Sequence, residues 1–170
     1  YPTPETKNSN LKHRPIGIGV QGLANVFFEL SLPFDSEEAK ELNEKIFETI
    51  YYHSMKCSIA LSKEREFSIM EYKSLSESSQ ETNEVELERL NRHLHGVIPE
   101  ELDREHYLGS YSSFNDSPLS RGEFQFDLWK YNQTDLRYDW TGLKKEVMKY
   151  GARNSLLVAP MPTASTSQIL

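Results

Sequence analysis

The chain has 170 residues, with 26 acidic and 19 basic side chains, a net charge of −7 and a mean hydropathy of −0.64. No apolar run approaches the roughly 20 residues that span a membrane, and no basic patch typical of nucleic-acid binding is evident, so we expect neither a membrane nor a nucleic acid as partner. The single cysteine, Cys57, excludes a disulfide within the chain and fits a reducing compartment such as the cytoplasm.

The negative charge lies in the middle of the chain. Residues 64–110 hold 12 acids and 5 bases, whereas the rest holds 14 of each (26 − 12 acids and 19 − 5 bases). Residues 67–80 carry several serines among charges with little periodicity, which predicts a mobile loop. We therefore expect three parts: a first segment, 1–63, an acidic region of little buried surface, 64–108, and a second segment, 109–170.

The first segment predicts two helices. Residues 1–15 are polar and are predicted to be extended or a loop, and the apolar run 18–30 predicts a buried helix that ends near Leu32. Asp35 and Glu38 have the spacing of a capping box that starts a long amphipathic helix to about Lys63. A packed free thiol is expected for Cys57 within it. The apolar side of this helix is predicted from the three- and four-residue spacing of Ala39, Leu42, Ile46, Ile50, His53, Cys57 and Leu61.

Shorter elements follow. Apolar spacing in 85–94 predicts a short helix closed by Gly96 and Pro99, and a turn is expected at 100–105. Residues 107–122 are predicted to be irregular, and 124–129 are compatible with either a short helix or a strand. A helix led by Asp139 and Trp140 is expected to place Leu143, Val147 and Tyr150 on one face and to end at Gly151.

The most informative stretch is at the C-terminal end. The apolar run 156–159 predicts a strand buried on both faces, which Pro160 and Pro162 stop. Hydroxyl residues then open a predicted helix, whose first N–H groups and dipole favour an anion. This arrangement favours a phosphate site, although Ser and Thr also cap ordinary helices. The candidate residues are Thr163, Ala164, Ser165 and Thr166.

Other motifs have simpler explanations. Residues 17–22 match G-x-G-x-x-G, but no buried strand precedes them and Glu41 falls inside the long predicted helix, which argues against a dinucleotide site. The glycines are expected to allow close packing at a helix start. The histidines lack metal-ligand spacing and are interpreted as surface residues. They are His13, His53, His93, His95 and His106.

Two polar stretches leave alternatives open. Residues 116–120 (DSPLS) fit either a substrate-positioning loop or ordinary turn chemistry. Arg153 and Asn154 precede the predicted strand. Either they pair with an anion, or they cap the preceding helix and bond to backbone.

The sequence resembles one family over nearly all of its length outside the acidic middle. That family is the large catalytic subunit of class I ribonucleoside-diphosphate reductase, of the eukaryotic and viral type. The resemblance is carried by residues 13–24 (HRPIGIGVQGLA), 33–34 (PF), 46–52 (IFETIYY), 117–122 (SPLSRG), 125–129 (QFDLW), 149–151 (KYG), 153–157 (RNSLL) and 159–166 (APMPTAST).

The resemblance implies a fold and a site. The fold is α/β: a fragment of the family's ten-stranded α/β barrel, mostly helical in this piece. In the family, the P-T-A-S-T stretch follows a barrel strand and binds the substrate diphosphate, which assigns that role to Thr163, Ala164, Ser165 and Thr166. The family joins the long helix to the S-P-L-S turn by a short loop, so about 40 residues near 64–108 are expected to be an insertion.

The resemblance also implies the chemistry of the complete enzyme. Ribonucleoside diphosphates are reduced to deoxyribonucleoside diphosphates by a thiyl radical, with a dimetal small subunit, thioredoxin or glutaredoxin, and nucleotides such as ATP and dATP as effectors. The family's catalytic residues have no counterpart in this sequence, and Cys57 inherits no role, so we expect no catalytic residue, metal or cofactor in this piece. The chain begins at Tyr1 and its last residues fall within a predicted helix, so a piece of a longer subunit is expected. The alternative is a non-catalytic truncated or rearranged remnant.

Overall fold

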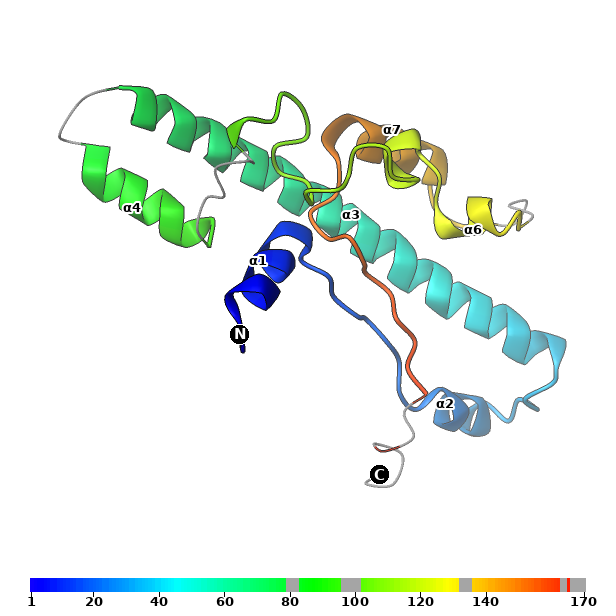
Figure 1. The fold of residues 1–170 in the computed structure, drawn as a ribbon. Coiled ribbons are helices and arrows are strands. Elements are labelled where there is room, and N and C mark those ends of the chain that lie inside the picture. The colour runs from blue at the N-terminus through cyan, green and yellow to red at the C-terminus, as the bar shows by residue number, and fades with distance from the viewer. Residues whose placement is uncertain (79–82, 96–101, 132–135, 163–164, 166–170) are drawn as a thin grey trace.

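The computed structural model describes residues 1–78, 83–95, 102–131, 136–162 and 165. These residues are mainly helical, and the longest element, α3 (Glu37–Glu77), runs diagonally through the whole molecule (Figure 1). The other helices are arranged around it. They are α1 (Pro4–His13), α2 (Leu23–Glu29), α4 (Glu84–His93), the 3-10 helix η2 (Leu119–Arg121), α6 (Gln125–Leu128) and α7 (Trp140–Tyr150).

Helix α1 occupies residues that were predicted to be extended or a loop. The Thr3 hydroxyl accepts a hydrogen bond from the Thr6 N–H, the Thr6 hydroxyl oxygen accepts one from the Thr3 N–H, and Pro4 takes the first helical position. Caps of this kind start helices without any apolar residue. No residue of α1 is buried, so hydrophobic periodicity carried no signal for it.

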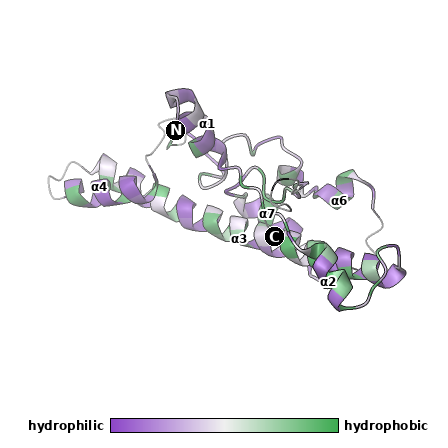
Figure 2. Cartoon of the chain, turned by 90° about the horizontal axis from the view of Figure 1, so that it is seen from below, coloured by the Kyte–Doolittle hydropathy of each residue, from purple (hydrophilic) through white to green (hydrophobic). Residues whose placement is uncertain are grey.

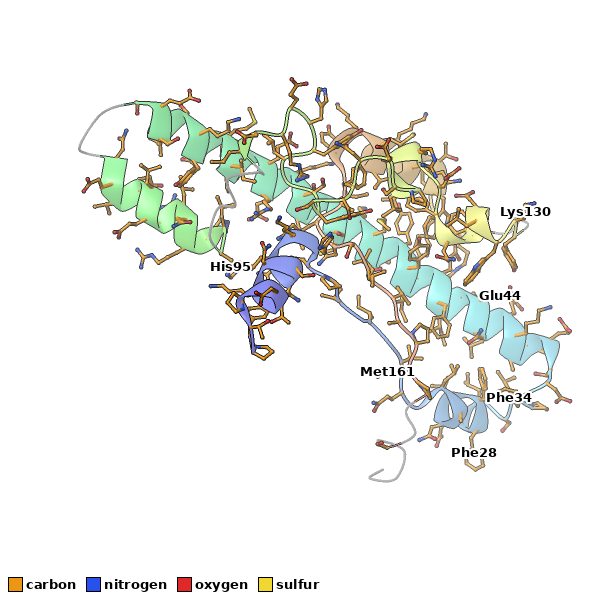
Figure 3. All side chains as sticks on the ribbon, in the orientation of Figure 1. Phe28, Phe34, Glu44, His95, Lys130 and Met161 are labelled. Atoms are coloured by element: carbon orange, nitrogen blue, oxygen red, sulfur yellow. The ribbon has the colours of Figure 1, made fainter. Side chains whose placement is uncertain are left out.

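Helix α2 is shorter and more exposed than predicted. Gly22 lies in the left-handed region at φ 75°, immediately before Leu23, and this turn delays the start of the helix. Phe27 is the one buried residue of α2. The Phe28 side chain is 82% exposed and projects away from the rest of the chain (Figure 3). The predicted buried helix over 18–30 is therefore wrong in its start and in its burial.

Helix α3 starts close to the predicted position and ends well beyond the predicted one. The N-cap is Ser36 rather than Asp35, and its hydroxyl oxygen accepts a bond of 3.1 Å from the Ala39 N–H. The helix continues past Lys63 to Glu77, so the loop predicted for 67–80 is wrong over its helical part. Packing of Ile69 stabilises these last turns, and tertiary contacts of this kind are not visible in local sequence.

The buried side of α3 is not the side that the sequence predicted. Met55 and Ile59 face the core, whereas Leu61 is 43% exposed. Of the seven predicted positions only Ala39 is buried. Cys57 is exposed, so the expected packed thiol is wrong. The reason is that α7 and the segment around Phe114 and Phe124 approach α3 from the opposite side.

Two separate clusters of buried side chains line α3. The larger one is here called the aromatic core. Its buried members are Met55, Ile59, Tyr111, Phe114, Phe124, Trp140, Leu143, Val147, Ala152 and Leu157. The smaller one consists of Ile69, Leu94 and Leu108, with Tyr72 and Leu102 against it.

The smaller cluster belongs to a projecting helical hairpin, which we call the arm (residues 64–78, 83–95 and 102–108). In the arm α4 runs beside the last turns of α3, and the hairpin extends beyond the other helices (Figures 1 and 2). Helix α4 confirms the predicted helix in 85–94, although Gly96 and Pro99 lie outside the described residues. The described part of 64–108 buries more than the sequence predicted, because residues 64–77 are helical and Arg65, Ser68 and Ile69 are buried.

The arm leaves and rejoins the rest of the chain at one turn of α3. A Cβ atom built on Gly109 would lie 1.8 Å from the Ser62 carbonyl oxygen, so the returning chain touches the helix backbone. Only a glycine allows such an approach. The family's shorter connection at this place, and hence an insertion, stays a prediction.

The predicted helix from 139 is confirmed as α7. The Asp139 carboxylate accepts a bond of 2.8 Å from the Gly142 N–H, Leu143 and Val147 are buried, and Gly151 ends the helix at φ 70°. Of the two alternatives for 124–129, the structure contains the helix, α6.

The C-terminal apolar run is extended but is not buried on both faces. Among the described residues the one sheet pairing is a parallel bridge between Ile18 and Val158. Leu157 packs into the aromatic core and is buried, whereas the neighbouring Leu156, on the other face, is 65% exposed. Residues 13–18 pair with one edge of the run. The ten-stranded barrel is therefore not seen in these residues.

Candidate functional site

The candidate site is the end of the extended segment 154–159, together with the turn that follows it. In Figure 1 this segment and residues 14–19 run side by side from the middle of α3 to α2. Four backbone hydrogen bonds join the extended segment to residues 13–18 and fix its register. They are Ser155 N–H to His13 O (2.9 Å), Ile16 N–H to Leu156 O (3.0 Å), Ile18 N–H to Leu157 O (2.8 Å) and Ala159 N–H to Ile18 O (3.0 Å).

The glycine-rich stretch lets the two segments approach closely. A Cβ on Gly17 would lie 3.3 Å from the Ala159 Cβ, and one on Gly19 would lie 3.2 Å from the Ala159 carbonyl oxygen. Both distances are tight for a real side chain. Close packing is thus the role of these glycines, as predicted, but their partner is the extended segment rather than a helix start.

Arg153 and Asn154 anchor the start of the extended segment. The Arg153 guanidinium donates from Nη2 to the Leu11 carbonyl oxygen at 2.9 Å, and the Asn154 amide donates from Nδ2 to the Arg14 carbonyl oxygen at 2.8 Å. Both residues are 9% exposed. Of the alternatives that the sequence left open, bonding to backbone is the one that the structure contains.

The predicted diphosphate-binding residues lie where this anchored segment ends. Pro160, Met161 and Pro162 are exposed and lead the chain away from α3 (Figure 3). Ser165 is exposed as well. Thr163, Ala164 and Thr166 lie outside the described residues, so their role remains a prediction.

A cavity of about 1080 Å³ flanks the extended segment on its open side. Its walls include Tyr51 and Met55 from α3, Trp140 from α7, and Leu156 and Pro160 from the segment itself. Burial raises the pKa of the Tyr51 hydroxyl, which therefore stays neutral near neutral pH. Beside the segment, the lining therefore combines the neutral Tyr51 with apolar side chains and the uncharged Asn154 and Ser155.

A carboxylate and an arginine close the rim of this cavity. Glu48 Oε1 accepts bonds from the Arg137 N–H (2.7 Å) and from the Trp140 indole N–H (3.1 Å), and its Oε2 accepts one from Arg137 Nε (3.0 Å). Burial, the largest single influence, raises the pKa of Glu48, but the bonds from Trp140 and Arg137 together outweigh it and hold the pKa below its usual range. Sequence reasoning did not single out Glu48, because one Glu in an amphipathic helix has no distinguishing spacing.

The remaining candidates have structural roles. The Ser120 N–H donates to the Ser117 hydroxyl oxygen, and Ser120 Oγ donates to the Ser117 carbonyl oxygen at 2.8 Å. Turn chemistry therefore accounts for residues 116–120. The His53 ring lies edge-on to Tyr52 and Tyr138, and His93, His95 and His106 are exposed. Within the described ranges, no three His, Cys, Asp or Glu side chains form a group that could hold a metal ion.

Comparison with known proteins identifies the family. A family model described as "Ribonucleotide reductase, barrel domain" matches residues 1–170. The chain belongs to this family. Over 170 residues it is 45% identical to the ribonucleoside-diphosphate reductase large chain of Schizosaccharomyces pombe, 42% to the large subunit of Caenorhabditis elegans and 40% to that of Danio rerio. The resemblance inferred from the motifs is therefore confirmed.

The match covers all of this chain but only 16% of the length of each of these three relatives. The reductase barrel-domain segment described here is thus about one sixth of a large subunit. In the described part of this reductase segment, no helix combines the length and the apolar character needed to cross a membrane.

Proposed function

We propose that this chain supplies the diphosphate-binding turn of a ribonucleotide reductase large subunit, which reduces ribonucleoside diphosphates for DNA synthesis. The observation that supports this most is the anchored segment 154–159, whose register is fixed by four backbone bonds and which leads directly into the exposed Ser165. The binding residues are Thr163, Ala164, Ser165 and Thr166. Backbone N–H groups and hydroxyls of such a turn donate hydrogen bonds to phosphate oxygens.

Other parts of the complete enzyme carry the reaction itself. A thiyl radical, generated with a dimetal small subunit, supplies the radical chemistry at the ribose, and thioredoxin or glutaredoxin supplies electrons. The rest of the large subunit closes the barrel around the open edge of 154–159 and takes up ATP and dATP as effectors. This chain's contribution is to bind and orient the substrate. We place the enzyme in the cytoplasm.

The test is steady-state kinetics with CDP on a complete large subunit that carries this sequence. Each hydrogen bond to a charged group contributes about 1.5–3 kcal/mol, so Ser165→Ala and Thr166→Ala should each raise KM about ten- to a hundredfold. Ala164→Asp, which sets a carboxylate against the phosphates, should be worse. Ser74→Ala, an exposed serine on the arm, is the matched control and should leave KM unchanged. Unchanged KM in all of the turn variants would refute the proposal.

A further inference from the structure

A buried serine and a buried asparagine form a closed hydrogen-bonded pair between α3 and the extended segment. Ser58 is 1% exposed and Asn154 is 9% exposed. Ser58 Oγ donates to the Asn154 side-chain oxygen at 2.9 Å and accepts from the Asn154 backbone N–H at 3.0 Å. The hydroxyl thereby uses both its donor and an acceptor site, and both bonds go to one residue.

Two further contacts make this pair the fixed start of the segment. The Ser58 carbonyl oxygen accepts a bond of 3.0 Å from the Arg153 N–H. The Asn154 side-chain amide also donates to the Arg14 carbonyl oxygen. Asn154 therefore links α3 and residues 14–19 to the extended segment that it starts. Residue 154 therefore cannot move along α3 without leaving several buried polar groups unpaired, which is costly.

Fixing residue 154 fixes the register of everything that follows it. Side chains of an extended segment alternate between faces, so a slip by one residue would exchange buried Leu157 with exposed Leu156 and move the chain by about 3.3 Å. Pro160 and Pro162 restrict the backbone between the segment and the turn, because each ring holds its φ near −65°. A displacement at 154 is therefore expected to shift the segment as far as Pro162, from which the chain enters the turn.

We propose that Ser58 and Asn154 are positioning residues for the diphosphate-binding turn; this inference rests on the function proposed above. They do not touch the substrate. They hold the segment that presents the turn, and binding geometry of this kind tolerates only about 0.5 Å of error.

Helix α3 offers a matched control. Ser62 lies one turn after Ser58 and is also fully buried, but its hydroxyl donates to the Tyr150 carbonyl oxygen at 2.8 Å, at the end of α7. Ser58→Ala and Ser62→Ala each remove one buried hydroxyl from the same helix. A role in stability alone predicts the same result for both variants, whereas a positioning role affects only the first.

The experiment measures the Kd for CDP, together with KM and kcat, on the complete subunit. We expect Ser58→Ala to raise Kd and KM by about ten- to a hundredfold, the range for a misplacement of about 1 Å, and Ser62→Ala to leave both unchanged. Ser58→Cys keeps a donor and an acceptor at this position, although both are weaker, so it should fall between wild type and Ser58→Ala even if the alanine variant folds poorly. Equal Kd values for the Ser58 and Ser62 variants would overturn the inference.

The Ala164→Asp variant separates this inference from the function on which it rests. If Ala164→Asp abolishes CDP binding while Ser58→Ala and Ser58→Cys bind normally, the turn binds diphosphate but the pair does not position it. If Ala164→Asp itself binds normally, the proposed function fails. Raised Kd values in the Ala164 and Ser58 variants, with Ser62→Ala unchanged, support both.

Discussion

Helix α3 passes through two different environments. Its central turns contact the aromatic core, where Tyr51, Phe124, Phe126 and Trp140 meet edge-on or tilted with ring centroids 4.8–6.4 Å apart. Its last turns are part of the arm, where Ile69, Leu94 and Leu108 form the cluster of buried residues and acidic side chains are numerous. The extended segment that leads to the candidate site is anchored to the central turns of α3, beside the aromatic core. We therefore expect the candidate site to depend on the aromatic core rather than on the arm.

The largest effect is expected from a matched pair of leucines. Leu143 in the aromatic core and Leu94 in the arm are both 4% exposed. Leu143→Ala should cost about 3–5 kcal/mol of unfolding free energy, because the surrounding rings cannot close the cavity. Leu94→Ala should open only the arm. Hydrogen exchange of the complete subunit distinguishes them: Leu143→Ala should speed exchange of the hydrogen-bonded Ser155 and Ala159 amides, and Leu94→Ala should speed it only in α4. Equal exchange at Ala159 in both variants would contradict the separation.

A smaller, pH-dependent effect is expected at the rim of the aromatic core. The bonds that Glu48 accepts require its ionised form, and its pKa in the folded state lies below the unfolded value of about 4.3. The stabilisation is therefore complete above about pH 5 and is lost as pH falls through the folded-state pKa. Glu48→Gln should cost about 1–2 kcal/mol at pH 7, discounted for the partly exposed Arg137, and less at pH 4.

Denaturant unfolding at both pH values measures the Glu48 effect. Glu86→Gln is the control: Glu86 pairs with Arg89 on the surface of the arm, and its removal should leave the unfolding midpoint unchanged at either pH. A cost for Glu48→Gln that is equal at pH 7 and pH 4 would contradict the assigned ionisation.

The smallest effect on the site is expected from removing α4 altogether. Lys73 Nζ donates to the Leu102 carbonyl oxygen at 2.6 Å, so a short Gly/Ser linker can replace residues 75–101. The unfolding free energy of the aromatic core should change by less than about 0.5 kcal/mol, since no buried member of this core lies in the replaced segment and Tyr107, the arm residue that packs against the core, is kept. The KM for CDP should stay within about twofold of wild type. A tenfold rise in KM would show that the arm supports the site after all.

The elements with strong local signals were predictable from the sequence. The Asp139 cap, the apolar spacing of Leu143 and Val147 and the terminal Gly151 specify α7 completely, and the same kinds of signal gave α4 and the start of α3. Helix α1 has a clear cap at Thr3, but apolar spacing gives no signal for it because none of its residues is buried.

Features that depend on distant contacts were not predictable in this way. The buried side of α3 is set by which segments approach it, so Cys57 was assigned to the wrong side. The exposure of Leu156 depends on which other segments pack against its face of the extended segment. At the candidate site, the hydroxyl turn was visible as a motif, whereas Ser58 was not, because one serine in a helix carries no spacing signal and its partner Asn154 is far away in sequence.

The contact between Gly109 and the Ser62 carbonyl oxygen has a practical consequence. A chain that departs from and returns to one helical turn meets the geometric condition for accommodating a foreign domain, since the guest's own termini need only be close together. The arm is therefore the place to graft a fluorescent reporter or an affinity handle onto a reductase of this kind. Because the graft would lie away from the extended segment, it would report on the enzyme without disturbing the proposed diphosphate-binding turn.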